Sequence, residues 1–139
     1  MQNSKKCLEN LSFKQSENNK LFTLTYSERL HIQKDFNKVF KNGLKLENKK
    51  IKILAYKRND GNSLRRLGLV TSRKVGNAVI RNRTKRRLRE IFRTNKYLLE
   101  PSLDLIFISK PETSLLNYSD LKKVVLVLLK NAKLYMGQD

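Results

Sequence analysis

Between Asn77 and Tyr97, apolar and basic residues recur with helical periodicity, and this stretch limits the possible folds more than any other part of the sequence. At 100° per residue the apolar positions fall within one arc of about 120°. They are Ile80, Leu88, Ile91 and Phe92, with the tolerant Thr84 among them. The opposite side carries a column at steps of four, three and four, made by Asn82, Arg86, Arg89 and Arg93. The stretch predicts a helix that buries one face and exposes a basic one.

The basic residues change in kind as well as in density along the chain. The 139 residues include 31 Lys+Arg against 12 Asp+Glu, a formal net charge of +19. From Arg65 to Arg93, nine of the eleven basic residues are arginines and Glu90 is the only acid, whereas lysine dominates elsewhere. Arginine offers a planar donor fork that matches phosphate and stacks on bases. The charge therefore indicates a nucleic acid or an anionic membrane surface as partner, and argues against a small cationic substrate.

Length and the rare residue types narrow the possibilities further. A chain of this size is expected to form one compact domain. Its apolar runs are too short for a membrane-spanning helix and its N-terminal residues too polar for a secretory signal, so we expect a cytoplasmic protein without a membrane partner. Cys7 and His31 are the only cysteine and the only histidine. This excludes an internal disulfide and metal sites built from several cysteines or histidines.

Hydrophobic spacing predicts the remaining elements. Two further helices are expected, one over residues 34–43 and one that begins after an N-cap at Ser119. Strands are expected over residues 50–56, 67–72 and 103–108. The strand over 67–72 is expected to pair antiparallel with the strand over 50–56, because the turn sequence at 59–62 favours a hairpin. The order of elements predicts an α+β fold. We expect a two-layer sandwich in which helices cover one face of an about four-stranded, mainly antiparallel sheet.

The basic helix and the residues before it favour contacts with phosphate. Gly76 and Asn77 permit the unusual backbone angles of a tight turn into a helix, and free amides at a helix start can bind phosphate. Like charges four residues apart destabilise an isolated helix by roughly 0.2 to 0.5 kcal/mol per pair. Six basic residues lie between Arg81 and Arg89, so a polyanion is expected to compensate them. The alternative is a solvated basic face without a ligand.

Residues 74–90, with Arg81-Asn82-Arg83 at their centre, closely resemble the Arg-Asn-Arg motif region of bacterial ribonuclease P protein subunits. Residues 35–43 and 66–70 match the same family. The resemblance implies a small basic protein that assists a catalytic RNA in removing the 5′ leader of precursor transfer RNA. It also implies a left-handed β-helix-β crossover, Mg²⁺ held mainly by the RNA, and no catalytic residue or metal site in the protein.

The resemblance extends over a domain of residues 26–135, between a flexible N-terminal extension (1–25) and a short tail (136–139). Carried over to this chain, the motif residues that face the catalytic RNA and the nearby substrate are Arg81, Asn82, Arg83, Lys85, Arg86 and Arg89. To these we add residues at the start of the helix and at the end of its column, namely Arg73, Lys74, Asn77 and Arg93. Together they form the expected RNA-binding set.

Three aromatic residues are candidates for binding the single-stranded leader. Phe36 and Phe40 match family aromatics at the mouth of a cleft, where stacking accepts any base for about 1 to 3 kcal/mol. Many relatives carry a further aromatic in the first long strand, where this chain has Leu54, with Tyr56 two residues later on the same face. Leu54 and Tyr56 are therefore the two candidates for the third position. The alternatives are core packing for the phenylalanines and an ordinary half-buried strand position for Tyr56.

One other function remains open, a ribosomal or general RNA-binding protein that uses the same basic helix. Composition alone does not separate it from a ribonuclease P subunit. A DNA-binding regulator is disfavoured, because the chain has no recognisable helix-turn-helix or zinc-finger spacing.

Overall fold

The computed structural model describes residues 24–136. Nearly all of the expected extension and tail, together with Cys7, lies outside the described residues. The first described residues, Leu24 and Thr25, already pack against the rest of the domain. Leu24 is buried in the main core, and the Thr25 amide donates a hydrogen bond of 3.0 Å to Glu28.

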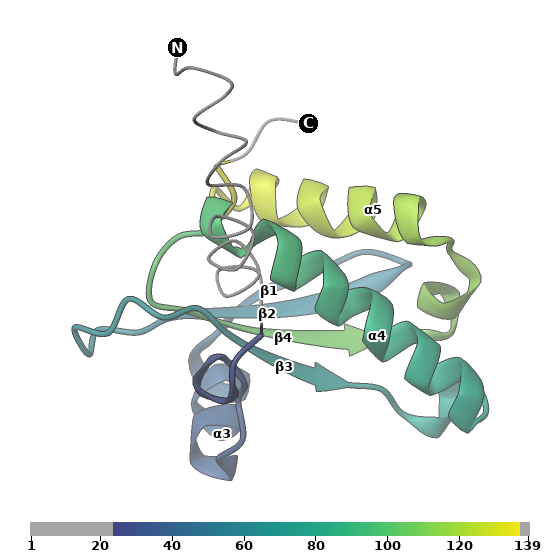
Figure 1. Cartoon of the computed structure of the whole chain (residues 1–139), viewed down its shortest axis with the longest axis horizontal. Coiled ribbons are helices and arrows are strands. Elements are labelled where there is room, and N and C mark those ends of the chain that lie inside the picture. Colours follow the sequence, from purple (N-terminus) through teal and green to yellow (C-terminus); the bar gives the residue numbers. More distant parts are fainter. Residues whose placement is uncertain (1–23, 137–139) are drawn as a thin grey trace, which may run out of the picture.

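The four strands form one mixed sheet in the order β1-β2-β4-β3 (Figure 1). They are β1 Leu44–Glu47, β2 Ile51–Lys57, β3 Arg66–Val70 and β4 Leu103–Ser109. β2 pairs antiparallel with both β1 and β4, whereas β3 pairs parallel with β4. The prediction that residues 67–72 pair antiparallel with residues 50–56 was therefore wrong. β4 is buried along almost its whole length, and this apolar strand takes the inner position between β2 and β3.

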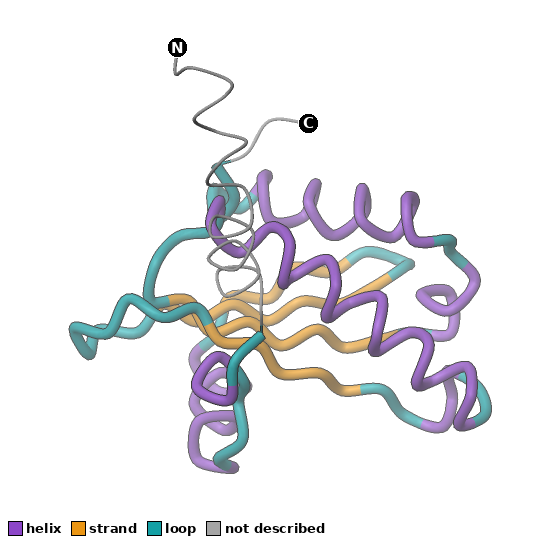
Figure 2. The backbone as a smooth tube through the Cα atoms, in the orientation of Figure 1, coloured by secondary structure: helices purple, strands orange, loops and turns teal. Residues whose placement is uncertain are grey.

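The helices cover both faces of the sheet, unequally (Figure 2). They are α3 Gln33–Asn42, α4 Ala78–Asn95 and α5 Tyr118–Asn131, joined by short 3-10 segments at η1 Tyr26–Glu28, η2 Arg73–Val75, η3 Lys96–Leu98 and η4 Pro111–Leu115. Successive residues of a strand point to opposite faces. On β2, Ile53 packs in the core with α4 and α5, while Leu54 packs with Val39 of α3. We expected helices on one face of the sheet only, but α3 covers the face opposite to α4 and α5.

The start of α4 explains how the basic helix is held. Asn77 caps the helix, since its side-chain oxygen accepts a 2.9 Å hydrogen bond from the Ile80 amide. Gly76 has a φ of +154°, and a Cβ placed there would lie 2.8 Å from Ile80, so both features favour glycine. α4 connects the parallel neighbours β3 and β4. The crossover connection is thus present, and its left-handedness stays a prediction.

α5 begins two residues earlier than expected. Asn117, not Ser119, is its N-cap and accepts a 2.8 Å hydrogen bond from the Asp120 amide. Asparagine and serine are both good caps, so local sequence left the choice open. Along the part of the chain that is described, no helix combines the length and apolar character needed to cross a membrane.

Candidate nucleic-acid interface

A set of arginines on η2 and α4 has no acidic partner. Among residues 24–136, no carboxylate forms an ion pair with any member of this set, which comprises Arg73, Arg81, Arg83, Arg86 and Arg89. We call these five the unpaired arginines. The Nε atoms of Arg81 and Arg83 are also buried without a hydrogen-bond partner, which is uncommon for polar atoms in proteins. Their charge is available to an external anion.

The other arginines of the same sequence window have structural partners. Arg65 donates to the Leu99 carbonyl and Arg87 to the Leu116 carbonyl, each at 2.8 Å. Arg93 pairs with Glu90, one turn earlier on α4, with 3.0 Å between Nε and Oε2. The hydrogen bond from Arg93 holds the pKa of Glu90 below its usual value. Arg93 belongs to the expected RNA-binding set, and the structure places it beside an acid that partly neutralises it.

The remaining expected RNA-binding residues lie on the same two elements as the unpaired arginines. Lys74 is exposed in η2, and Asn82 is exposed on α4. Lys85 is half-buried, and Asn77 uses its side chain as the cap described above. The expected RNA-binding residues thus lie on η2 and along the length of α4.

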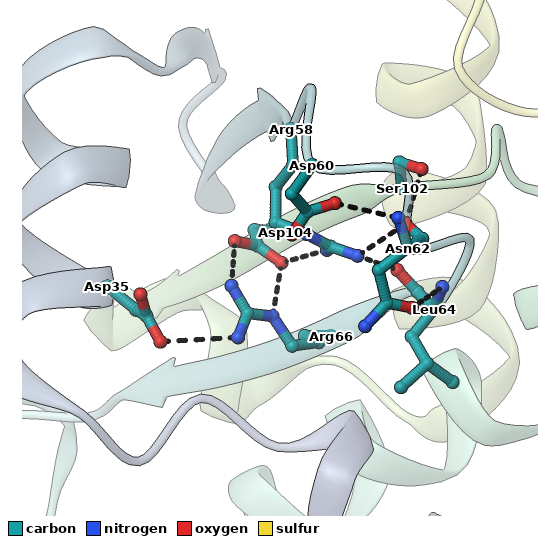
Figure 3. A network of polar contacts seen from close by, with 8 residues as sticks. All are labelled: Asp35, Arg58, Asp60, Asn62, Leu64, Arg66, Ser102 and Asp104. Carbon is teal, nitrogen blue, oxygen red and sulfur yellow. Dashed lines mark hydrogen bonds and ion pairs between the residues drawn. The ribbon is translucent and has the colours of Figure 1, made fainter.

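A second group of arginines surrounds a buried carboxylate, Asp104 of β4 (Figure 3). The Asp104 side chain is 2% exposed and accepts hydrogen bonds from Arg66 at 2.7 and 2.8 Å and from Arg58 at 2.5 Å. Arg66 also reaches Asp35 of α3 at 3.2 Å, and Arg58 donates to the Leu64 carbonyl at 2.7 Å. This Asp104 network ties α3 and the loop after β2 to the sheet. Hydrophobic periodicity did not point to Asp104, although a single acid within an apolar strand is itself a clue to a buried ion pair.

The aromatic face lies on the side of the sheet that α3 covers. The rings of Phe36 and Phe40 are stacked, with centroids 6.4 Å apart. Phe40 is 45% exposed, while Phe36 is half-buried and packs so closely on β3 that a Cβ at Gly68 would lie 2.8 Å from its ring. Tyr56 is half-buried and packs against the small core under α3, to which Leu54 belongs. Leu54 itself is only 1% exposed. Of the two candidates for the third position, only Tyr56 reaches the surface.

A hollow of about 280 Å³ adjoins Tyr56 and is bordered by Lys38 of α3. Three carboxylates also line it, those of Asp35, Asp60 and Asp104. Each of these carboxylates is paired with Arg58 or Arg66. Within residues 24–136, no group of three or more His, Cys, Asp or Glu is placed to hold a metal ion. The acids of the hollow therefore serve the protein's own arginines.

The fold and these surfaces define a class: small basic α+β proteins with an arginine-lined helix next to an exposed aromatic face. A family model described as Ribonuclease P matches residues 24–133. The chain belongs to the ribonuclease P protein family.

Individual relatives agree with this assignment. The chain is 36% identical over 107 residues to the ribonuclease P protein component of Streptococcus pneumoniae serotype 4, covering 77% of this chain and 85% of that protein. The RNase P protein of Staphylococcus aureus superposes with a TM-score of 0.70 at 29% identity, covering 78% of this chain and 97% of that one. For the Thermotoga maritima protein the TM-score is 0.67 at 36% identity, covering 75% and 96%. The chain is thus a protein subunit of ribonuclease P, an endoribonuclease that processes transfer RNA 5′ ends. This finding supports the ribonuclease P prediction over the ribosomal alternative.

Proposed function

We propose that the surface of η2 and α4 binds the catalytic RNA of ribonuclease P and the nearby precursor transfer RNA. The observation that carries the proposal is the set of unpaired arginines, whose mutual repulsion phosphate groups would relieve. The contacting residues are Arg73, Lys74, Asn77, Arg81, Asn82, Arg83, Lys85, Arg86, Arg89 and Arg93. We assign the function to the domain of residues 26–135, and place it in the cytoplasm, where precursor transfer RNA is made.

The aromatic face of α3 is proposed to bind the 5′ leader. Phe40 has exposed ring surface and is stacked on Phe36, so a base can extend the stack. Tyr56 supplies a further ring at the adjoining hollow. Stacking depends little on base identity, because every base has a flat face. Such a surface suits leaders of varied sequence.

Bond cleavage is proposed to depend on Mg²⁺ held mainly by the RNA subunit, where the ions would activate the attacking water and stabilise the leaving oxygen. The described acids fit this division of labour. Asp35, Asp60 and Asp104 are occupied by arginines, and Glu90, the acid on the basic helix, is paired with Arg93. We therefore assign no catalytic residue and no metal site to the protein.

A reconstitution experiment tests the proposal. The full chain is added to the catalytic RNA at low Mg²⁺, and leader removal from precursor transfer RNA is followed over time. We expect the protein to stimulate cleavage, and the double variant Arg86→Glu/Arg89→Glu to lose that stimulation. Lys123→Glu, an exposed charge reversal on α5, is the matched control and should behave as wild type. Equal stimulation by the double variant and the wild type would contradict the proposal.

A further inference from the structure

Besides Phe36 and Phe40, two more rings are stacked on one another at the surface. Tyr26 of η1 and His31, just before α3, have ring centroids 3.9 Å apart and ring planes 18° from parallel. The His31 Nε2 atom lies 2.7 Å from the Tyr26 carbonyl oxygen, which fixes the histidine ring. Tyr26 is 76% exposed. Most of its ring is therefore open to a third flat ring.

The segment that carries this pair is anchored by buried contacts. Glu28 and Lys96 form a buried ion pair at 2.6 Å, and the Thr25 amide donates to Glu28 at 3.0 Å. Burial raises the pKa of Glu28, but the hydrogen bonds from Lys96 and Thr25 outweigh it, and the net pKa lies below the usual value. Directly before His31, the Leu30 amide donates a hydrogen bond of 2.9 Å to the Leu67 carbonyl of β3. An anchored segment loses little freedom when it binds a ligand.

A groove of about 240 Å³ lies over the edge strand β3, and His31 is the member of the stacked pair that lines it. Its lining also includes Phe36, Arg29 and Arg89. The Arg29 guanidinium donates a long hydrogen bond of 3.5 Å to the Leu24 carbonyl, which leaves donors for a further acceptor. Phe36 belongs to the aromatic face and Arg89 to the unpaired arginines. The groove thus joins the two surfaces to which we assign leader and phosphate binding.

Flat rings and guanidinium groups around one small groove match the chemistry of a nucleotide. A base stacks on the rings, and its phosphate accepts hydrogen bonds from the arginines. A double helix would keep its bases stacked on one another, so a single strand is required. An acidic peptide would occupy the arginines and leave the exposed Tyr26 ring without a partner.

We propose that this groove binds a nucleotide of the single-stranded precursor leader, with its base stacked on the Tyr26–His31 pair and its phosphate held by Arg29 and Arg89. The inference rests on the proposed function, because the strand reaches the groove from the aromatic face of α3. Tyr26, His31 and Arg29 lie outside the set of residues that the motif and the aromatic face supplied.

The chain contains no tryptophan, so Tyr26→Trp introduces a single fluorescent reporter at the pair. The full-length variant is assembled with the catalytic RNA and titrated with precursor transfer RNA or with mature transfer RNA. We expect precursor to quench the fluorescence in a saturable way and mature transfer RNA to leave it unchanged. Val127→Trp, at a 50% exposed position on α5, is the control and should respond to neither.

Affinity gives an independent measurement. Tyr26→Ala should weaken precursor binding by about 5- to 150-fold, the range expected when a single base loses its stacking partner. Tyr26→Phe should retain wild-type affinity, because stacking needs the ring and not the hydroxyl. Circular dichroism verifies that both variants fold.

The outcomes separate this inference from the proposed function. Suppose that precursor does not change the fluorescence of Tyr26→Trp, that Tyr26→Ala keeps wild-type affinity, and that Phe40→Ala still weakens precursor binding. This result would overturn nucleotide binding in the groove and leave the proposed function standing. If Tyr26→Ala weakens binding of precursor and of mature transfer RNA equally, nucleotide binding in the groove is also overturned. If neither Tyr26→Ala nor Phe40→Ala affects precursor binding, the groove and the leader-binding role of the aromatic face both fail, while RNA binding by the unpaired arginines is tested separately by the Arg86→Glu/Arg89→Glu variant.

Discussion

The arginines around Asp104 and the unpaired arginines of α4 use the same side chain in opposite ways. Arg58 has a side chain only 6% exposed and donates to a buried carboxylate and to loop carbonyls. Arg86 is exposed and has no ion-pair partner among residues 24–136. The buried guanidinium of Arg58 needs Asp104, since an uncompensated buried charge is costly. Partner atoms, and not arginine density, therefore separate the structural arginines from those that we propose to face RNA.

This comparison predicts that the two groups respond to different measurements. Changes in the Asp104 network should lower the free energy of unfolding. Changes among the unpaired arginines should leave it nearly constant and alter RNA binding and its dependence on salt.

The largest effect is expected for Asp104→Asn. Asparagine keeps the shape of the side chain but leaves Arg58 and Arg66 without the buried negative charge. Breaking a buried pair in this way costs about 3 to 5 kcal/mol. Urea unfolding followed by circular dichroism measures the loss, with Arg86→Ala as the matched control that should stay within about 0.5 kcal/mol of wild type. A loss no larger than that of the control would remove the distinction between the two groups.

The next largest effect concerns the aromatic face. Phe40→Ala should reduce affinity for precursor transfer RNA by about 1 to 3 kcal/mol, because a leader base no longer stacks on the ring. Affinity of the holoenzyme for mature transfer RNA, which lacks the leader, should change little. Binding titrations with both RNAs test this. If Phe40→Ala loses equal affinity for precursor and for mature transfer RNA, Phe40 has a purely structural role.

A smaller effect is expected when one unpaired arginine is removed. Arg86→Ala should weaken binding to the catalytic RNA and reduce the slope of log affinity against log salt by about 0.7 to 0.9, the change expected when one phosphate is no longer neutralised. The free energy of unfolding should not fall, because removing a like charge from α4 relieves repulsion. Titrations at several salt concentrations measure the slope. An unchanged slope would show that Arg86 does not bind phosphate.

The smallest effect is expected when the acidic partner of Arg93 on α4 is neutralised. Glu90→Gln removes the ion pair on α4, which at this exposure contributes about 0.3 to 0.5 kcal/mol to stability. Because the pKa of Glu90 is lowered in the folded protein, its contribution is present above the ordinary value of 4.5 and is lost as the pH falls through the folded pKa. The stability difference between variant and wild type should therefore vanish in acid. RNA affinity should rise slightly at neutral pH, and a fall would mean that Arg93 does not face RNA.

Much of the candidate site could be predicted because its parts are local in sequence. The periodicity of residues 77–97 predicted α4 and its basic face, and the spacing of Phe36 and Phe40 predicted α3. The resemblance to ribonuclease P proteins supplied the family and the crossover connection. Strand β1 was missed, since its four residues are mostly exposed and carry little pattern.

What local sequence could not predict involves contacts between distant residues. The turn after β2 favoured a hairpin, but β4 came to lie between β2 and β3. Burial of Leu54 left Tyr56 as the surface aromatic. The Asp104 network joins residues up to 69 positions apart along the chain, from Asp35 to Asp104, and no periodicity within one segment reports such a pairing.

Local sequence was enough to predict the three long helices and strands β2, β3 and β4, the place where basic charge gathers, and the family that the motif resembles. Helical and strand periodicities arise from the geometry of a few neighbouring residues, so a short segment carries them in full. The packing of distant segments decided which arginines are neutralised, which face of the sheet α3 covers, and that His31 and Arg89 line the same groove. Those features depend on distances between segments, which are fixed only when the whole core packs.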